Sequence, residues 1–373
     1  MFFHVILTTE CNLQCRYCFG EALDDMDSDF SDIEVEYSLP KKINYDVHLL
    51  EKFCKQDPDC AVTFYGGEPL LRIDELKLIM DKVKAKHFMI QTNGLLLDHL
   101  PSEYINRFHT ILVSIDGEEA LTDYYRGAGT FRSVMDNVKV IVRNGFKGEL
   151  IARMTVMEKT DIYKQVLWLL DNNEFPFSSV HWQLNAGFWE NDFAKRNFKE
   201  WTEENYNPGI RRLVKFWVDQ MQNGVVLRLY PFLGIAQSLL SGEKESLLRC
   251  GGGWINYAIQ TDGNIVPCPT MWGMKNHYLG HVSNANPLKL PKAFISGSCL
   301  KCDDLGICGG RCLYANVTRR WNSEAYGLVC STVRNLIDTI SEELPRIEGL
   351  ISDGKIGLNN FDFMRYNGCE IIP

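Results

Sequence analysis

Three cysteines stand close together near the N-terminus, in the segment TTECNLQCRYCFG at residues 8–20. Cys11, Cys15 and Cys18 have the spacing C-x3-C-x2-C, and the nearest further cysteine is Cys54. A structural zinc ion or a fully ligated cubane takes four protein ligands, so three thiolates would leave one metal position open. An open position is typical of a catalytic metal site. The alternative is a zinc site completed by a distant cysteine or histidine.

A second group of seven cysteines lies in the last third of the chain. A chain of this length without an export signal rarely carries a disulfide framework, so clustered cysteines of this kind indicate metal ligation. Paired zinc ribbons that bind nucleic acid are the alternative interpretation. In order, the segment reads Cys250, Gly263, Cys268, then Cys299-x2-Cys302-x5-Cys308-x3-Cys312, and finally Cys330.

The composition restricts the class of protein. The chain has 373 residues, enough for two domains, and its 45% hydrophobic and 23% charged residues are typical of a soluble globular protein. A net charge of −9 and a pI near 5.5 argue against a nucleic-acid or anionic-membrane partner. No apolar run approaches the ~20 residues that span a bilayer. The opening MFFHVIL lacks a basic region and is not a signal peptide, so we predict a cytoplasmic protein.

The elements that must position the first cysteine group alternate regularly in the first half of the chain. Short apolar segments alternate with amphipathic ones, which predicts strands and helices in turn. Six such units predict a parallel sheet that curls into a full or partial barrel, with its chemistry at the carboxyl ends of the strands. The predicted strands span residues 2–8, 61–65, 87–92, 110–115, 150–156 and 180–184. The predicted helices span residues 45–56, 72–84, 101–106, 132–144 and 162–172.

Polar motifs follow the ends of several predicted strands. The segment GGEP at 66–69 joins two glycines, which allow close backbone approach, to a carboxylate that would complement a cation. QTNG at 91–94 and SIDG at 114–117 end the third and fourth strands, and Arg153 lies on the fifth. Each motif alone is weak, because such pairs are common in turns. Their occurrence at successive strand ends, behind the cysteines, favours one shared site.

This arrangement resembles the radical S-adenosylmethionine (SAM) superfamily, whose signature is C-x3-C-x-aromatic-C, over residues 2 to about 185. The resemblance implies that Cys11, Cys15 and Cys18 hold a [4Fe–4S] cluster whose fourth iron binds SAM. Reductive cleavage of SAM would give a 5′-deoxyadenosyl radical that abstracts a substrate hydrogen. The residues expected to contact SAM are Tyr17, which offers a face to a base, and Gly66, Gly67, Glu68, Asn93, Ser114, Asp116 and Arg153.

The second cysteine group resembles the SPASM pattern, which is carried by radical SAM enzymes that act on peptides and proteins. It implies two auxiliary iron–sulfur clusters, and thus three clusters in all. The connectivity of the family assigns an outer set, Cys299, Cys302, Cys308 and Cys330, and an inner set, Cys250, Cys268 and Cys312. No cysteine lies within residues 251–267, so the inner set lacks a fourth ligand. Either Cys369, Cys54, Cys60 or a carboxylate completes it, or an iron stays open to substrate, which we favour slightly.

We therefore expect an α/β fold, a partial (β/α)6 TIM-like barrel followed by a small cysteine-rich iron–sulfur domain. The expected parts are the radical SAM barrel at 1–185, a bridging region at 186–249, and the SPASM domain with its tail at 250–373. Regular periodicity is expected to fade from residue 250 onward. The eight carboxylates between Glu21 and Glu36 are expected to form a solvated or disordered excursion.

Three smaller sets of residues carry further expectations. The alternating His181, Gln183 and Asn185 on the sixth strand either face the site or are covered by the C-terminal part. Aromatic residues are candidates for a peptide-binding wall, although an interdomain core is the favoured interpretation. Cys54 is expected to be a buried small hydrophobe. The aromatic residues in question are Trp182, Trp189 and Trp201.

The sequence thus predicts an oxygen-sensitive radical SAM enzyme, an oxidoreductase or bond-forming maturase that modifies a peptide or protein side chain, as in the maturation of ribosomal peptides (RiPPs). An electron donor such as ferredoxin or flavodoxin is expected, with no nucleic-acid or membrane partner. Pro269 occupies the position where the sulfatase-maturating branch places an aspartate base, which argues against formylglycine formation. The alternatives are an enzyme acting on a small cofactor precursor and a non-catalytic iron–sulfur electron carrier.

Overall fold

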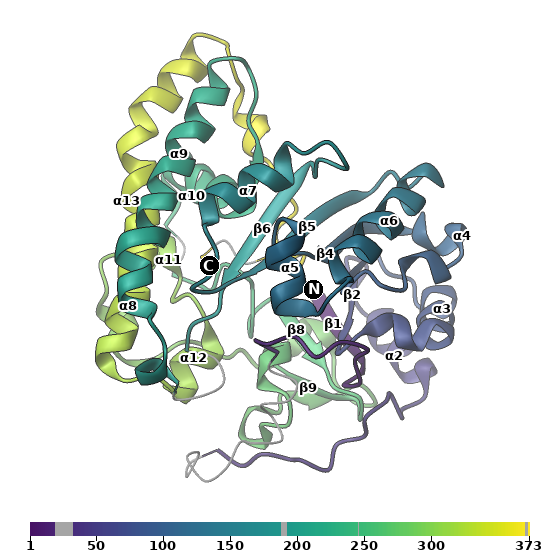
Figure 1. The fold of residues 1–373 in the computed structure, drawn as a ribbon. Helices are drawn as coiled ribbons and strands as arrows, with labels where there is room; N and C mark the ends of the chain where they lie inside the picture. The colour runs from purple at the N-terminus through teal and green to yellow at the C-terminus, as the bar shows by residue number, and fades with distance from the viewer. Residues whose placement is uncertain (19–32, 188–191, 245, 370–371) are drawn as a thin grey trace.

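The computed structural model describes residues 1–18, 33–187, 192–244, 246–369 and 372–373. A ten-stranded sheet forms its centre, in the order β10-β9-β8-β1-β2-β3-β4-β5-β6-β7 (Figure 1). Its six barrel strands pair in parallel with their sequence neighbours, which confirms the predicted α/β class. These strands are β1 (Phe2–Thr8), β2 (Ala61–Gly66), β3 (His87–Thr92), β4 (Phe108–Ser114), β5 (Glu149–Val156) and β6 (Ser179–Leu184).

Helices cross between the parallel strands. Aspartates cap two of them, because the Asp46 side chain accepts a hydrogen bond from the amide of His48, and Asp161 accepts one from the amide of Lys164. The strands are buried on both faces, as parallel sheets covered by helices require. The crossover helices are α2 (Val47–Cys54), α3 (Ile73–Lys82), α4 (Ser102–Ile105), α5 (Glu119–Arg126), α6 (Thr130–Arg143) and α7 (Ile162–Leu170).

The sheet continues from the barrel into the cysteine-rich part of the chain. β8 (Asn256–Ile259) pairs in parallel with β1, and β9 (Asn264–Val266) and β10 (Gly280–His281) follow as antiparallel strands. At the other edge, β7 (Arg228–Leu229) pairs in parallel with β6. Cys250 and Cys268, which flank β8 and β9, are therefore held near the first strand of the barrel. The division of the chain at residues 185 and 249 stays a prediction.

The C-terminal third contains a long helix, α13 (Ser323–Ser352). It packs against α9 (Asn207–Met221) and α10 (Tyr230–Ser241) (Figure 1). The expectation that regular structure fades from residue 250 onward is wrong for this segment. The helical signal is an apolar stripe at spacings of three, four and seven, all of it buried. The stripe consists of Val329, Val333, Leu336, Ile340 and Ile347.

Several smaller expectations can be compared with the structure. Trp182 and Trp201 are buried in the core, so they form no wall of a site, and Trp189 lies outside the described residues. Cys54 is fully buried among apolar side chains, as expected. Most of the acidic excursion also lies outside the described residues, but Glu34 and Glu36 both pair with Lys275.

Short helices complete the second half of the chain. α8 (Phe198–Trp201) precedes α9, while α11 (Leu305–Cys308) and α12 (Leu313–Thr318) lie between β10 and α13. Among the described residues, no helix has both the length and the apolar character needed to cross a membrane.

Candidate active site

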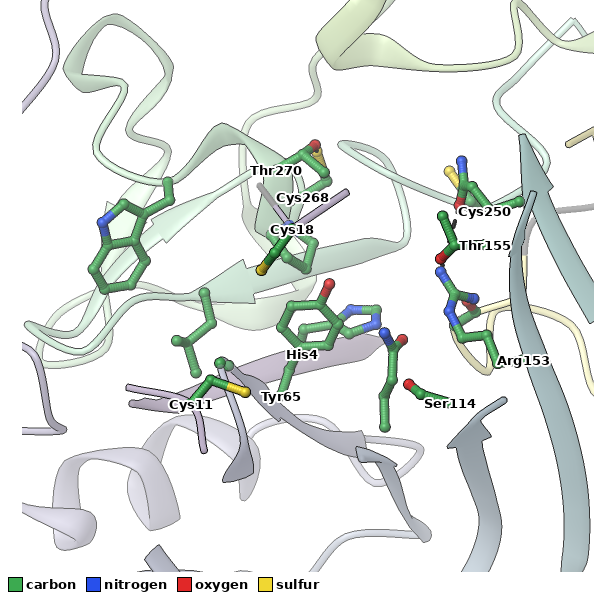
Figure 2. Close-up of a pocket in the computed structure, with 18 of the residues that line it drawn as sticks. His4, Cys11, Cys18, Tyr65, Ser114, Arg153, Thr155, Cys250, Cys268 and Thr270 are labelled. Atoms are coloured by element: carbon green, nitrogen blue, oxygen red, sulfur yellow. Dashed lines mark hydrogen bonds between the residues drawn. The ribbon is translucent and has the colours of Figure 1, made fainter. Parts of the chain in front are cut away.

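A cavity of about 310 Å³ lies at the carboxyl ends of the barrel strands. Its lining draws residues from the ends of all six, including Thr8, Gly66, Thr92, Ser114, Thr155 and Asn185. Two sets of thiols also line it, the N-terminal set Cys11, Cys15 and Cys18 and the inner set Cys250, Cys268 and Cys312. Figure 2 shows Cys11 at the lower left of the drawn side chains, Cys18 and Cys268 at the upper centre, and Cys250 at the upper right. The structure thus brings together two cysteine groups that are more than 200 residues apart in sequence.

The N-terminal thiols lie on a loop that α5 holds from outside. The Arg16 amide donates to the carbonyl of Tyr125 at 2.8 Å, and the Arg16 Nε donates to the carbonyl of Tyr124 at 2.7 Å. Within the loop, the Cys18 amide donates to the Cys15 carbonyl at 2.9 Å. These bonds fix the backbone between the second and third cysteine, so the thiols are positioned by the fold itself.

A buried network of Tyr17, Asp116 and Arg126 also stabilises the cysteine loop. The Tyr17 hydroxyl donates to Asp116 Oδ2 at 2.6 Å, and Arg126 donates to both carboxylate oxygens at 2.9 and 2.8 Å. The amide of Thr155 donates to Asp116 Oδ1 at 2.9 Å. Asp116 is 0% exposed. Burial and the neighbouring carboxylate raise the pKa of Tyr17, although Arg126 opposes the rise, so its hydroxyl stays protonated.

This network bears on two residues expected to contact SAM. Asp116 is saturated by Tyr17, Arg126 and Thr155, an arrangement that suits a positioning residue better than a ligand contact. Tyr17 lines the cavity while its hydroxyl stays on Asp116. The Arg126 guanidinium also lies 5.4 Å from the centre of the Tyr17 ring, which adds a cation–π contact. Direct SAM contacts by Tyr17 and Asp116 remain predictions.

The two glycines of GGEP permit a close backbone approach. A Cβ atom on Gly66 would lie 2.1 Å from the carbonyl oxygen of Thr8, and one on Gly67 would lie 2.3 Å from that of Glu10. The amides of Gly67 and Glu68 bond the same two carbonyls, at 2.8 and 2.9 Å. The end of β2 is therefore bonded directly to the start of the cysteine loop, which only residues without a side chain allow.

Glu68 turns inward rather than toward open space. Its carboxylate accepts hydrogen bonds from the amides of Leu70 and Asn93, at 2.9 and 2.7 Å, and from the Thr92 hydroxyl at 2.8 Å. Burial raises the pKa of Glu68 to about 7, against these three bonds. The Asn93 amide group in turn donates to Asn12 Oδ1 at 2.7 Å and contacts the Cys11 sulfur at 3.7 Å. Glu68 thereby orients Asn93, which lines the cavity.

Polar side chains from β4, β5 and β6 form one wall of the cavity. Arg153 donates to the carbonyl of Gly368 at 2.7 Å and contacts His181 Nδ1 at 3.2 Å. Ser114, Gln183 and Asn185 also line the cavity, whereas His181 is buried behind Arg153. The C-terminal tail therefore reaches Arg153, one of the residues expected to contact SAM.

The inner thiols are held against the ends of the barrel strands. Cys268 Sγ lies 2.9 Å from the Thr270 hydroxyl. Arg311, directly before Cys312, donates to the carbonyls of Leu184 and Ala186 at 3.0 and 3.3 Å. Its φ of 56° is unusual for a residue with a side chain. Arg311 has this conformation at the point where its side chain links the segment of Cys312 to the end of β6.

The other cysteines considered as ligands of the inner set are Cys369, Cys54 and Cys60. Cys54, at the end of α2, and Cys60, directly before β2, are fully buried. Their free thiols form a hydrogen bond with each other. Cys369 is buried near Tyr230. None of these three is among the described residues that line the cavity.

The outer thiols gather near the surface. Cys299, Cys302 and Cys330 influence one another electrostatically, and Cys308 lies close to the first and last of them. Cys302 and Cys330 are exposed. The Asn316 side chain donates to the Cys299 sulfur at 3.7 Å. The structure thus groups the four residues that the connectivity of the resembled family implies, and their role as metal ligands stays a prediction.

The thiol chemistry fits iron–sulfur ligation. Burial raises the pKa of Cys15 and Cys308 to about 11 and that of Cys268 to about 12. Buried thiols need a cationic metal centre to become thiolates. Among the described residues, no three Cys, His, Asp or Glu side chains converge closely enough to hold a single metal ion. In a cubane, by contrast, each thiolate binds a different iron.

Sequence reasoning missed several residues of the cavity. His4 and Tyr65 line it from β1 and β2, and His4 Nδ1 lies 3.0 Å from the Asn256 oxygen. Thr155 also lines it. The signal was available for His4 and Thr155, because period two places them on the same faces as Thr8 and Arg153. Arg126 and Arg311 lie on segments for which no structure was predicted.

Comparisons with known proteins agree with this geometry. Residues 5–164 match the family described as the radical SAM superfamily. The chain is 22% identical to the cysteine-type anaerobic sulfatase-maturating enzyme of Clostridium perfringens, over 81% of this chain and 85% of that one. It is also 22% identical to the radical SAM cyclopropyl synthase TigE of Paramaledivibacter caminithermalis, over 83% of this chain and 67% of that one.

Solved structures share the fold. The enzyme anSMEcpe with bound AdoMet and Cp18Cys peptide matches with a TM-score of 0.68 at 17% identity, over 94% of this chain and 99% of that one. Streptococcus suis SuiB bound to its precursor peptide SuiA matches with a TM-score of 0.55 at 17% identity, over 85% of this chain and 72% of that one. The match to the radical SAM superfamily implies SAM and a [4Fe–4S] cluster as cofactors. Residues 5–164 thus form a radical SAM domain, and the chain as a whole is similar to the anaerobic sulfatase-maturating enzymes.

Proposed function

We propose that this enzyme modifies a peptide or protein side chain, with SAM and one [4Fe–4S] cluster at Cys11, Cys15 and Cys18. The observation that carries the proposal is the single cavity lined by these thiols and by the inner set. Bound together, the cluster and SAM supply a 5′-deoxyadenosyl radical that abstracts a substrate hydrogen. We place the enzyme in the cytoplasm, with a low-potential electron carrier as its donor.

The chain's own residues orient and separate the reactants. The Tyr17–Asp116–Arg126 network holds the cysteine loop in place, and Asn93 fixes the side of that loop nearest Cys11. Arg153 and Ser114 offer a cation and a hydroxyl to the polar end of SAM. Such preorganisation lowers the cost of bringing SAM and substrate together.

A peptide substrate is supported by the relatives and by the cavity. Relatives with this fold include an anaerobic sulfatase-maturating enzyme and SuiB, each solved with a peptide. The cavity combines amide side chains such as Gln183 and Asn185, which can bond a peptide backbone, with apolar residues such as Leu248 and Trp272. The mixed lining suits a polypeptide, which presents both kinds of group.

We further propose that Cys250, Cys268 and Cys312 hold an inner auxiliary cluster whose fourth position faces the cavity. Support comes from the three thiols on the cavity lining, which among the described residues includes none of Cys369, Cys54 and Cys60. Four outer cysteines would hold a second auxiliary cluster. Pro269, beside Cys268, supplies no base, so we propose a reaction other than formylglycine formation.

Anaerobic reconstitution tests the radical chemistry. Purified protein is loaded with iron and sulfide, reduced with dithionite and incubated with SAM, and 5′-deoxyadenosine is quantified by chromatography. Wild type should form the nucleoside, and Cys15→Ala should not. Cys54→Ala is the matched control, because it removes a buried thiol outside the cavity and should keep the activity. Wild-type protein with full iron and no 5′-deoxyadenosine would overturn the proposal.

A second experiment tests the substrate class. Short peptides encoded beside the gene are incubated with the loaded enzyme and SAM, and each product is analysed by mass spectrometry. A peptide substrate should change mass and accelerate SAM cleavage. If small cofactor precursors accelerate cleavage and no peptide does, the substrate assignment is wrong while the radical chemistry stands.

A further inference from the structure

Charge is distributed unevenly along the chain. The whole protein carries a net charge of −9, yet residues 287–334 contain seven Lys and Arg and only three Asp and Glu. This segment alone therefore has a charge of +4, and the rest of the chain has −13. A local charge opposite to that of the whole molecule steers one class of partner toward one face.

The basic segment surrounds the outer thiols. The Arg319 side chain reaches over Gly297, two residues before Cys299. Arg334 bonds Asp304, two residues after Cys302, with a closest approach of 2.8 Å. α11, α12 and the first part of α13, which carry the second half of this segment, lie together on one side of the molecule, opposite α3 and α4 (Figure 1). Lys301, Arg319 and Arg334 thus lie near the outer thiols, whereas Arg311 of the same segment lines the cavity.

Large apolar side chains stand on the same segment. Phe294 is 56% exposed and Leu300, between Cys299 and Lys301, is 59% exposed. Ser296, close to Phe294 in sequence, bonds Asn316, whose side chain contacts the Cys299 sulfur. Exposed apolar residues with charged neighbours are typical of protein interfaces. We call this surface the basic face; it comprises Lys292, Phe294, Leu300, Lys301, Arg319 and Arg334.

We propose that the basic face docks an acidic electron-carrier protein beside the outer thiols. The inference rests on the proposed function, because SAM cleavage consumes one electron. The docked carrier would lose one electron and the enzyme would gain it. The carrier is a better occupant than an acidic substrate peptide for a geometric reason. Cys302 and Cys330 are exposed and lie outside the cavity lining, whereas the substrate cavity is lined by the inner and N-terminal sets.

Charge reversal tests the proposal in the loaded holoenzyme. The triple variant Lys292→Glu, Lys301→Glu, Arg319→Glu alters three exposed side chains of the basic face. The matched control Lys55→Glu, Lys82→Glu, Lys84→Glu makes the same charge change around α2 and α3. SAM cleavage is driven either by an acidic flavodoxin, kept reduced by its reductase, or by dithionite. At subsaturating flavodoxin, the triple variant should be slower by about tenfold or more, because steering charges act on association.

The other measurements separate the possible failures. With dithionite, both variants should match wild type, since a small reductant needs no docking surface, and iron per chain should be unchanged. The flavodoxin defect should shrink as salt is added, because salt screens surface charges. If flavodoxin drives the triple variant as fast as the control, the docking proposal is wrong. The docking proposal is also wrong if the triple variant loses affinity for an acidic peptide but not for flavodoxin. If wild type fails even with dithionite, the proposed function fails first.

Discussion

The N-terminal and outer cysteine groups show two ways to present thiols. Cys11, Cys15 and Cys18 line a cavity, on a loop held by backbone bonds to α5 and β2. The outer group supplies four thiols near the surface, and two of them are exposed. A set of three ligands facing a cavity leaves a metal position for a reactant, whereas four ligands facing solvent leave none.

The supports of the two groups differ as well. The N-terminal loop depends on a buried ion pair and on glycines that admit no Cβ. The outer group depends on short turns and on helices of four and six residues, α11 and α12. Such short elements are marginal by themselves, so ligand binding would contribute directly to their folding. Loss of a cysteine should therefore remove chemistry in the first region and structure in the second.

The largest expected effect is on chemistry. Cys15→Ala should abolish SAM cleavage, because two thiolates cannot hold the cluster in a state that binds SAM, while the barrel stays folded. The measurement is 5′-deoxyadenosine formation, alongside circular dichroism. Full retention of activity would refute the assignment of the N-terminal group.

The second expected effect is on structure. Cys308→Ala should remove about one cluster, roughly four irons per chain, and lower the melting temperature of the C-terminal part, because metal binding there is folding free energy. Iron analysis and thermal denaturation under anaerobic conditions measure both. Unchanged iron per chain would contradict the outer ligand set.

The third expected effect concerns the buried network. Asp116→Asn leaves the Arg126 charge buried without its partner and should cost about 3–5 kcal/mol of unfolding free energy. Tyr17→Phe removes one bond to a charged group and should cost about 1.5–3 kcal/mol. Anaerobic urea denaturation measures both. Equal, small losses would mean that the network does not support the loop.

The smallest expected effect separates two glycines. Gly67→Ala places a Cβ 2.3 Å from the Glu10 carbonyl oxygen and should cost about 1–3 kcal/mol of stability and weaken SAM binding. Gly349 lies in the last turn of α13, and a Cβ atom added there has no neighbour within 4 Å. Gly349→Ala should therefore raise the unfolding free energy by about 0.5–1 kcal/mol. Thermal denaturation and SAM titration measure the pair. The account predicts opposite signs for the two changes in stability.

Much of the barrel could be predicted from the sequence. The first and third strands match their predicted bounds, at 2–8 and 87–92, because period and turn residues agree there. α5 was missed, since its eight residues carry only two buried apolar side chains, Leu121 and Tyr125. The pairing of β8 with β1 could not be predicted, because contacts over 250 residues leave no local pattern.

The candidate site divides in the same way. Its cysteines have a fixed spacing and could be found from the sequence. Arg126 and Arg311 could not, because a charged residue beside a glycine resembles any surface residue until its partners are known. Glu68 and Asp116 were identified by motif, but the direction of their side chains depends on tertiary hydrogen bonds. Spacing locates such residues, and packing decides what they contact.

The most direct test of the central claim is electron–nuclear double resonance on the reduced, anaerobically loaded protein with SAM labelled with ¹⁵N at its amino group. If Cys11, Cys15 and Cys18 leave one iron for SAM, the labelled nitrogen should couple strongly to the cluster, and the coupling should vanish in Cys15→Ala. Absence of coupling in active, fully loaded protein, or zinc in place of iron, would contradict the account.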